Sequence, residues 1–169
     1  MSYQTTVDHA AIKTGQLLTI ALLLASFALQ RWEGVALLAV IFLITATVHP
    51  LGPFVLIYRL LLKPSGLVKP DIRVDNLQPH LFGQAIGAAT AAMAAAILHA
   101  EFAVTGWSLV WVLIALTFIS YKGWCIGCFL YYQLGRLGLR GFFAKKPTDR
   151  NVRLGSRPRT PAGQESRLP

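Results

Sequence analysis

Charged residues are scarce in this sequence. Only 14% of its 169 residues are Asp, Glu, Lys or Arg, whereas a soluble domain carries about 25%, so there are too few charges to cover a water-exposed surface. Hydrophobic residues make up 54% of the chain, and segments 17–29, 35–48 and 83–99 contain no charged residue. The composition excludes an ordinary soluble domain and indicates a small integral membrane protein, with the lipid bilayer as its first partner.

Cysteine and acidic residues are also few. Two cysteines in a chain of this length cannot form the disulfide framework of a secreted domain. Lys and Arg outnumber Asp and Glu by 16 to 7, but the basic residues lie in connections and in the C-terminal segment, so no nucleic-acid partner is expected. Because no phosphate-binding glycine loop, nucleophile elbow or metalloprotease motif is present, the sequence does not predict a classical enzyme and identifies no cofactor.

Four apolar stretches approach the length of about 20 residues that a helix needs to cross a bilayer. They lie at about 14–30, 32–48, 82–100 and 107–132. The links within the first and second pairs are short, which predicts two antiparallel hairpins, and the segment between the pairs at 54–62 is expected to lie along the membrane interface. The sequence thus predicts an all-α protein, a four-transmembrane-helix bundle over 1–135 and a basic, Pro/Gly-rich tail over 136–169.

The distribution of Lys and Arg predicts the orientation of these helices. The first short link contains Arg31 alone and the last contains no basic residue. The middle connection and the C-terminal tail are rich in Lys and Arg. We therefore expect a multi-pass protein of the inner (plasma) membrane. Both termini, including the C-terminal tail, and the middle connection are expected in the cytoplasm.

A short pattern occurs twice and suggests an internal duplication. Val7-Asp8 is followed by Gly15-Gln16, and Val74-Asp75 is followed by Gly83-Gln84, each at the start of an apolar helix. The pattern predicts two parallel copies of a helical hairpin, which argues against a cleaved signal peptide at the first helix. Gln16 and Gln84 are expected to form interhelical hydrogen bonds, and the glycines and alanines of the third helix are expected to allow close packing.

Both cysteines lie in one short segment, Cys125-Ile-Gly-Cys128, near the end of the last predicted helix. On a helix, residues three apart share a face, so the two thiols can approach each other. Lys122 precedes Cys125 by three residues, where a cation favours the reactive thiolate or instead reaches the lipid headgroups. Cys125, Cys128 and Lys122 are therefore the candidate catalytic residues. Two buried, chemically inert thiols remain the alternative interpretation.

Three histidines lie just outside predicted helix ends on the same side of the membrane: His9, His49 and His80. Together with Cys125 and Cys128 they are weak candidates for metal ligands, because two thiolates supply only half of a tetrahedral site. His99 is expected at the opposite side.

The chain resembles a bacterial family of four-helix integral membrane proteins known as domain of unknown function 4395. The resemblance covers about residues 7–135 and rests on three segments: Val7-Asp8, Leu81-Phe82-Gly83-Gln84 and Cys125-Ile126-Gly127-Cys128. The family tends to have Arg where this chain has Leu81. The resemblance implies the four-helix fold and an association with thioredoxin-like and sulfur-transfer proteins, without an established activity.

Two functional hypotheses follow. The first is thiol-disulfide exchange between the cysteine pair and a thioredoxin-like partner. The alternative is a non-catalytic accessory or structural subunit of a larger membrane complex, respiratory or photosynthetic. The two differ in one respect: only the first requires both Cys125 and Cys128.

Overall fold

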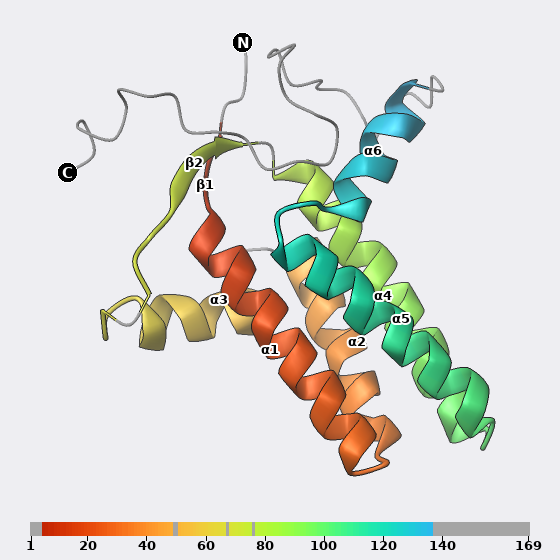
Figure 1. Cartoon of the computed structure of the whole chain (residues 1–169). Coiled ribbons are helices and arrows are strands. Elements are labelled where there is room, and N and C mark those ends of the chain that lie inside the picture. Colours follow the sequence, from red (N-terminus) through yellow and green to blue (C-terminus); the bar gives the residue numbers. More distant parts are fainter. Residues whose placement is uncertain (1–4, 49–50, 67, 76, 137–169) are drawn as a thin grey trace.

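A computed structural model describes residues 5–48, 51–66, 68–75 and 77–136 of the chain. It is almost entirely helical, with one short pair of strands (Figure 1). In chain order, the elements are β1 (Thr5–Asp8), α1 (His9–Ala28), α2 (Trp32–Thr47), α3 (Pro53–Ile57), η2 (Tyr58–Leu62, a π-helical turn), β2 (Ile72–Asp75), α4 (Gln78–His99), α5 (Ala103–Tyr121) and α6 (Ile126–Arg136).

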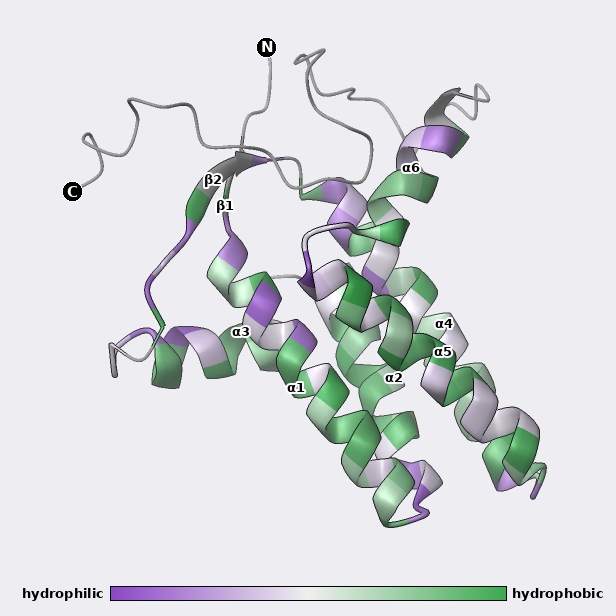
Figure 2. Ribbon diagram, viewed as in Figure 1, coloured by the Kyte–Doolittle hydropathy of each residue, from purple (hydrophilic) through white to green (hydrophobic). Residues whose placement is uncertain are grey.

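Helices α1, α4 and α5 are each long and apolar enough to cross a membrane, and α2 is a shorter apolar helix of 16 residues. Hydrophobic residues occur along the whole length of all four (Figure 2). Many large apolar side chains on them face outward, among them Leu43, Val104 and Val112. In water such a surface would be unfavourable, whereas in a bilayer it contacts lipid. The chain therefore has the character of a membrane protein.

Helix α4 packs against α2, α5 and α6. Small residues allow the neighbouring helices to approach α4 closely. Its buried residues include Gly87, Ala88, Ala91, Ala94 and Ala95. A Cβ atom on Gly87 would lie 2.8 Å from the Phe42 ring of α2. The close packing expected of this helix is thus present, because its face carries almost no side-chain volume.

The two strands form an antiparallel pair in which Thr5 lies opposite Asp75 and Asp8 opposite Ile72. This pairing connects the start of α1 to the segment that leads into α4, and the backbone N–H of His9 extends it by donating to the carbonyl of Asp71 (2.8 Å). The strands, the first turns of α1 and α4, and α6 therefore lie at one end of the bundle, here called the strand end (Figure 1). The α1–α2 and α4–α5 turns lie at the other end, here called the turn end.

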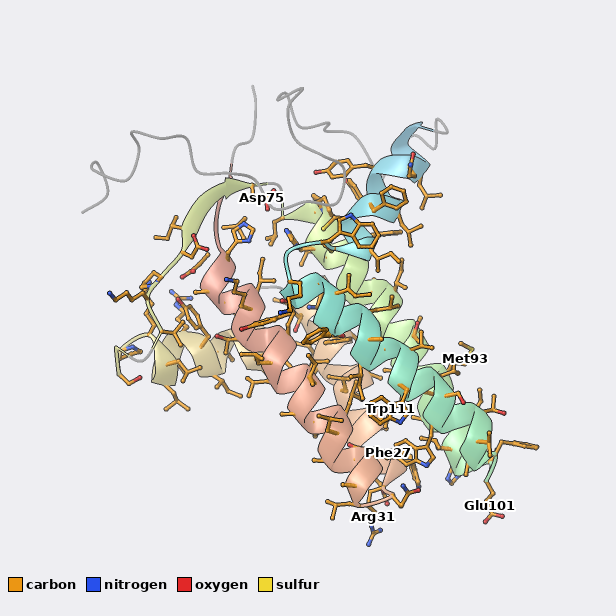
Figure 3. All side chains as sticks on the ribbon, in the orientation of Figure 1. Phe27, Arg31, Asp75, Met93, Glu101 and Trp111 are labelled. Carbon is orange, nitrogen blue, oxygen red and sulfur yellow. The ribbon has the colours of Figure 1, made fainter. Side chains whose placement is uncertain are left out.

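Figure 3 marks the two ends: Asp75 lies at the strand end, and Arg31 and Glu101 lie at the turn end. Segment 54–62, expected as one interfacial helix, consists of α3 followed by the π-helical turn. His49 lies outside the described residues, as does the predicted tail over 136–169 except for Arg136, which is the last residue of α6.

Candidate functional site

The last predicted helix is two helices in the structure. Instead of one helix over 107–132, α5 ends at Tyr121 and α6 begins at Ile126. Gly123 lies between them with φ of 106°, a backbone conformation that an α-helix cannot contain and that glycine adopts without steric cost. The cysteine pair therefore begins just before a helix, and not in the middle of one.

Cys125 caps the N-terminus of α6. The backbone N–H of Cys128 donates a hydrogen bond to Cys125 Sγ (3.2 Å), so the sulfur satisfies one of the amide donors that a helix leaves unpaired in its first turn. A helix N-terminus carries partial positive charge and favours a thiolate. Cys125 is half-buried, whereas Cys128 is only 7% exposed. The two thiols thus differ in accessibility and in local electrostatics.

Close contact between α4 and α6 brings a histidine to the thiols. A Cβ atom on Gly127 would lie 2.6 Å from Cα of Gly83, so the two backbones meet where neither residue has a side chain. His80 is one turn before Gly83 on α4, and its Nδ1 lies 3.7 Å from Cys128 Sγ. The donor atoms of His80, Cys125 and Cys128 all lie within 4.8 Å of one another.

Asp75, at the end of β2, orients this histidine. Its Oδ2 lies 3.2 Å from His80 Nε2 and 3.1 Å from His9 Nε2. Because a carboxylate only accepts hydrogen bonds, Nε2 of His80 carries the proton in this pair, and Nδ1 faces the thiols. His9 is 2% exposed, and its Nε2 has no hydrogen bond of good geometry within the described part of the chain. Its imidazole lies edge-on to His80, with ring centres 6.0 Å apart.

The corresponding residue of the first strand, Asp8, has a structural role. Its Oδ1 accepts from the backbone N–H groups of Ala10 (3.0 Å) and Asp71 (3.1 Å), and its Oδ2 accepts from the Tyr58 hydroxyl (2.8 Å). Burial, and then the hydrogen bond to Asp8, raise the pKa of Tyr58 above its ordinary value. Asp8 therefore fixes the start of α1, the strand pair and the π-helical turn relative to one another.

The two cysteines titrate very differently. A hydrogen bond from the Cys128 thiol lowers the pKa of Cys125 well below its ordinary value, and the His80 imidazole lowers it further, although burial opposes both. The pKa of Cys128 is raised by its hydrogen bond to Cys125 and by burial. In this arrangement Cys125 is the thiolate and Cys128 is the thiol that donates to it.

The sequence-predicted residues divide into two groups. His9, His80, Cys125 and Cys128 lie together at the strand end. Lys122 is exposed, and its ammonium group lies 5.4 Å from the centre of the Phe118 ring. His80, from a helix distant in sequence, is the side chain that contacts the thiols.

The interhelical bond predicted for Gln16 is present, from its Nε2 to Ser120 Oγ (2.8 Å). Oε1 of Gln84 is buried without a hydrogen bond to any described residue. Sequence reasoning did not select Asp75 as a site residue, although its place in the repeated Val-Asp pattern was a usable signal.

Residues 7–136 match the model of the family described as Domain of unknown function (DUF4395). The chain belongs to this family. No curated protein and no solved structure matches it.

Proposed function

We propose that this protein is a membrane thiol-disulfide exchange component, in which Cys125 is the attacking thiol and Cys128 the resolving one. The observation that carries the proposal is the position of the pair: Cys125 Sγ accepts the N–H of Cys128 at the start of α6, and Cys125 is the more exposed of the two residues. A thiolate stabilised in this way and reachable from solvent is the reactive species in exchange.

The exchange is reversible. The thiolate of Cys125 attacks one sulfur of the disulfide of a thioredoxin-like protein, which breaks that disulfide and forms a mixed one. Cys128 then loses its proton and attacks the Cys125 sulfur, which releases the partner as a dithiol. Two electrons pass to the partner, whose two thiols take up the proton that Cys128 releases and one proton from solvent, and the Cys125–Cys128 disulfide remains. Reduced partner reverses each step.

We further propose that α2 is a fourth span, that the two strand-plus-hairpin units are copies of one another, and that the strand end faces the cytoplasm of a bacterial cell. The basic residues of the described middle connection support this orientation: Arg59, Lys63, Lys69 and Arg73 all follow α2 and precede α4. A cytoplasmic strand end would present Cys125 to a cytoplasmic partner.

The first test is labelling of sealed vesicles of both orientations with a membrane-impermeant maleimide, before and after reduction. We expect labelling of Cys125 only from the cytoplasmic side, and much more labelling after reduction. A Glu101→Cys variant in a Cys125→Ser/Cys128→Ser background is the matched control, because Glu101 lies exposed at the turn end and should label from the other side.

The second test is the trapping of a mixed disulfide. Cys128→Ser leaves the attacking thiol without its resolving partner, so incubation with oxidised thioredoxin should accumulate a covalent adduct, and Cys125→Ser should not. Two results together would contradict the proposal: both thiols remain reduced in an oxidising glutathione buffer, and the Cys125→Ser/Cys128→Ser variant keeps the full activity of the protein in cells. These results would favour an accessory subunit.

A further inference from the structure

The donor atoms at the strand end have the composition and spacing of a metal site. Zinc is bound at about 2.3 Å by sulfur and about 2.0 Å by nitrogen, which places neighbouring ligand atoms of a tetrahedral site about 3.5 to 3.8 Å apart. Cys128 Sγ and His80 Nδ1 are already 3.7 Å apart, and Cys125 Sγ lies within 4.8 Å of both. The three donor atoms therefore lie at or near the separation of ligands that share one ion.

The histidine is prepared for ligation by its other nitrogen. Asp75 accepts from His80 Nε2 at 3.2 Å, so Nδ1 is the nitrogen that faces the thiols, and it can bind a metal once any proton on it has left. Metal-bound histidines characteristically donate their second ring N–H to a carboxylate, which fixes the tautomer and the ring orientation. The Asp75–His80–Cys128 series has this order of contacts, and it extends across β2, α4 and α6.

Charge balance favours the same interpretation. Two thiolates and one neutral imidazole around a divalent ion form a group without net charge, which is less costly to bury than free thiolates. The cysteines and His80 are buried or half-buried. Asp75 then retains its negative charge beside His9, whose buried Nε2 lies 3.1 Å from it and forms an ion pair if His9 is protonated.

We propose that, in the reduced protein, Cys125, Cys128 and His80 bind one Zn²⁺ ion, with Asp75 as a positioning residue and the fourth coordination position occupied by water. No electron is transferred on binding: each thiol that is still protonated, and His80 Nδ1 where it carries a proton, releases that proton to solvent, and two S–Zn bonds and one N–Zn bond form. The inference goes beyond exchange chemistry, because it assigns the same thiols a second, non-redox state.

The test is metal titration of the full chain in detergent, reduced with a phosphine and freed of metal by a chelator. Co²⁺ is the spectroscopic probe. We expect one ion per chain, with visible bands of tetrahedral coordination and a thiolate charge-transfer band, both abolished by Zn²⁺. Cys125→Ser, Cys128→Ser and His80→Ala should each lose the thiolate-imidazole spectrum. Zn²⁺ should also protect Cys125 from maleimide.

His99→Ala is the matched control, because it removes a histidine from the other end of the same helix. It should bind Co²⁺ as the unaltered chain does. Asp75→Asn should retain the tetrahedral bands while its affinity falls about 10–100-fold, a combination that a general folding defect would not produce. His80→Asn provides a second variant if His80→Ala does not fold.

Three results would overturn the metal inference: no binding by the reduced chain, binding unchanged by His80→Ala and His80→Asn, or one ion per two chains held by cysteines alone. Its failure is distinguishable from failure of the exchange proposal. A chain that forms a reversible disulfide but binds no metal contradicts only the metal site, and a chain that binds Co²⁺ but never forms a disulfide or a mixed disulfide contradicts only exchange.

Discussion

The two ends of the bundle are built differently. At the strand end, polar groups far apart in sequence contact one another: Asp8 with Tyr58, Asp75 with His9, and His80 with Cys128. These groups are buried or half-buried. At the turn end, the ion pair joins Arg31 to Glu33, two residues apart, with 72% and 52% of their side chains exposed.

Helix α4 makes the comparison sharp because it has a histidine at each end. His80 contacts a carboxylate and a thiol, whereas His99 lies against the Trp32 ring, with ring centres 4.8 Å apart. Burying polar groups is costly unless they are paired. A bundle of apolar helices is therefore expected to keep a buried polar network only where the network has a role in structure or function. This difference is the reason for placing the proposed function at the strand end.

The largest effect on this comparison should come from Gly127→Ala. The added Cβ would collide with the Gly83 backbone at 2.6 Å, so α6 must move away from α4, and Cys128 must move away from His80. We expect a loss of about 1–3 kcal/mol of stability and of Co²⁺ binding, measured by thermal unfolding in detergent and by titration.

The control for that substitution is Gly15→Ala, because its Cβ would meet only Phe54 Cβ at an ordinary 3.8 Å. It should leave Co²⁺ binding unchanged and raise stability by up to about 1 kcal/mol, because alanine favours a helix over glycine. If Gly127→Ala behaved in the same way, the close approach of α4 and α6 would not determine the geometry of the site.

A loss of stability of similar size is expected from Asp8→Ala, which removes the helix cap and leaves the Tyr58 hydroxyl and the Asp71 N–H without their acceptor. Loss of a cap costs about 1 kcal/mol and a stranded buried donor about 1–3 kcal/mol, so we expect about 2 kcal/mol in chemical denaturation. Tyr58→Phe removes one of these bonds and should cost about half as much. Equal effects of the two variants would mean that the cap contributes little.

The main features of the bundle could be predicted from sequence. Uncharged apolar runs located α1, α2 and α4 to within a few residues at most ends. The early starts of α1 and α4, at His9 and Gln78, were missed because polar first turns are stabilised by capping and by proline at the helix start rather than by hydropathy.

The site was predicted only in part. The cysteine pair was evident as the entire cysteine content of the chain, and His9 and His80 were grouped with it from their predicted side of the membrane. The break before α6 was not foreseen, because a single glycine at 123 does not show its positive φ in the sequence. The Asp75–His80 contact depends on the strand pair, whose four-residue strands lie more than 60 residues apart without a turn to indicate pairing.

Thiol reactivity gives a test that depends on pH. An ordinary cysteine has a pKa of about 8.5, so its alkylation rate rises about tenfold per pH unit below that value. Because the pKa of Cys125 is lowered, its thiolate is already formed near neutral pH, and alkylation of the metal-free, reduced chain should be nearly constant from about pH 6 to 9.

His80→Ala removes one of the groups that lower the Cys125 pKa. Alkylation near pH 6 should therefore fall about tenfold for each unit that the pKa rises, and the rate should regain its dependence on pH. His99→Ala should keep the flat profile. If the alkylation rate of the unaltered chain instead rose steadily up to pH 9, Cys125 would be an ordinary thiol. His80 would then have no more effect on thiol reactivity than His99 at the other end of α4.

The smallest expected effect lies at the turn end and has the opposite sign. Glu101 occupies the α4–α5 turn with φ of 64°, a left-handed conformation that costs a residue with a side chain about 1 kcal/mol relative to glycine. Glu101→Gly should therefore raise stability by up to about 1 kcal/mol in thermal unfolding and leave Co²⁺ binding and Cys125 alkylation untouched. Gly66→Ala tests the converse, because Gly66 has φ of 71° and no atom near its missing Cβ, so its expected loss comes from the backbone alone. If Glu101→Gly stabilises the turn without any change at the thiols, the turn end does not depend on the contacts that position the site at the strand end. If the variant instead alters thiol reactivity, the two ends are coupled through α4.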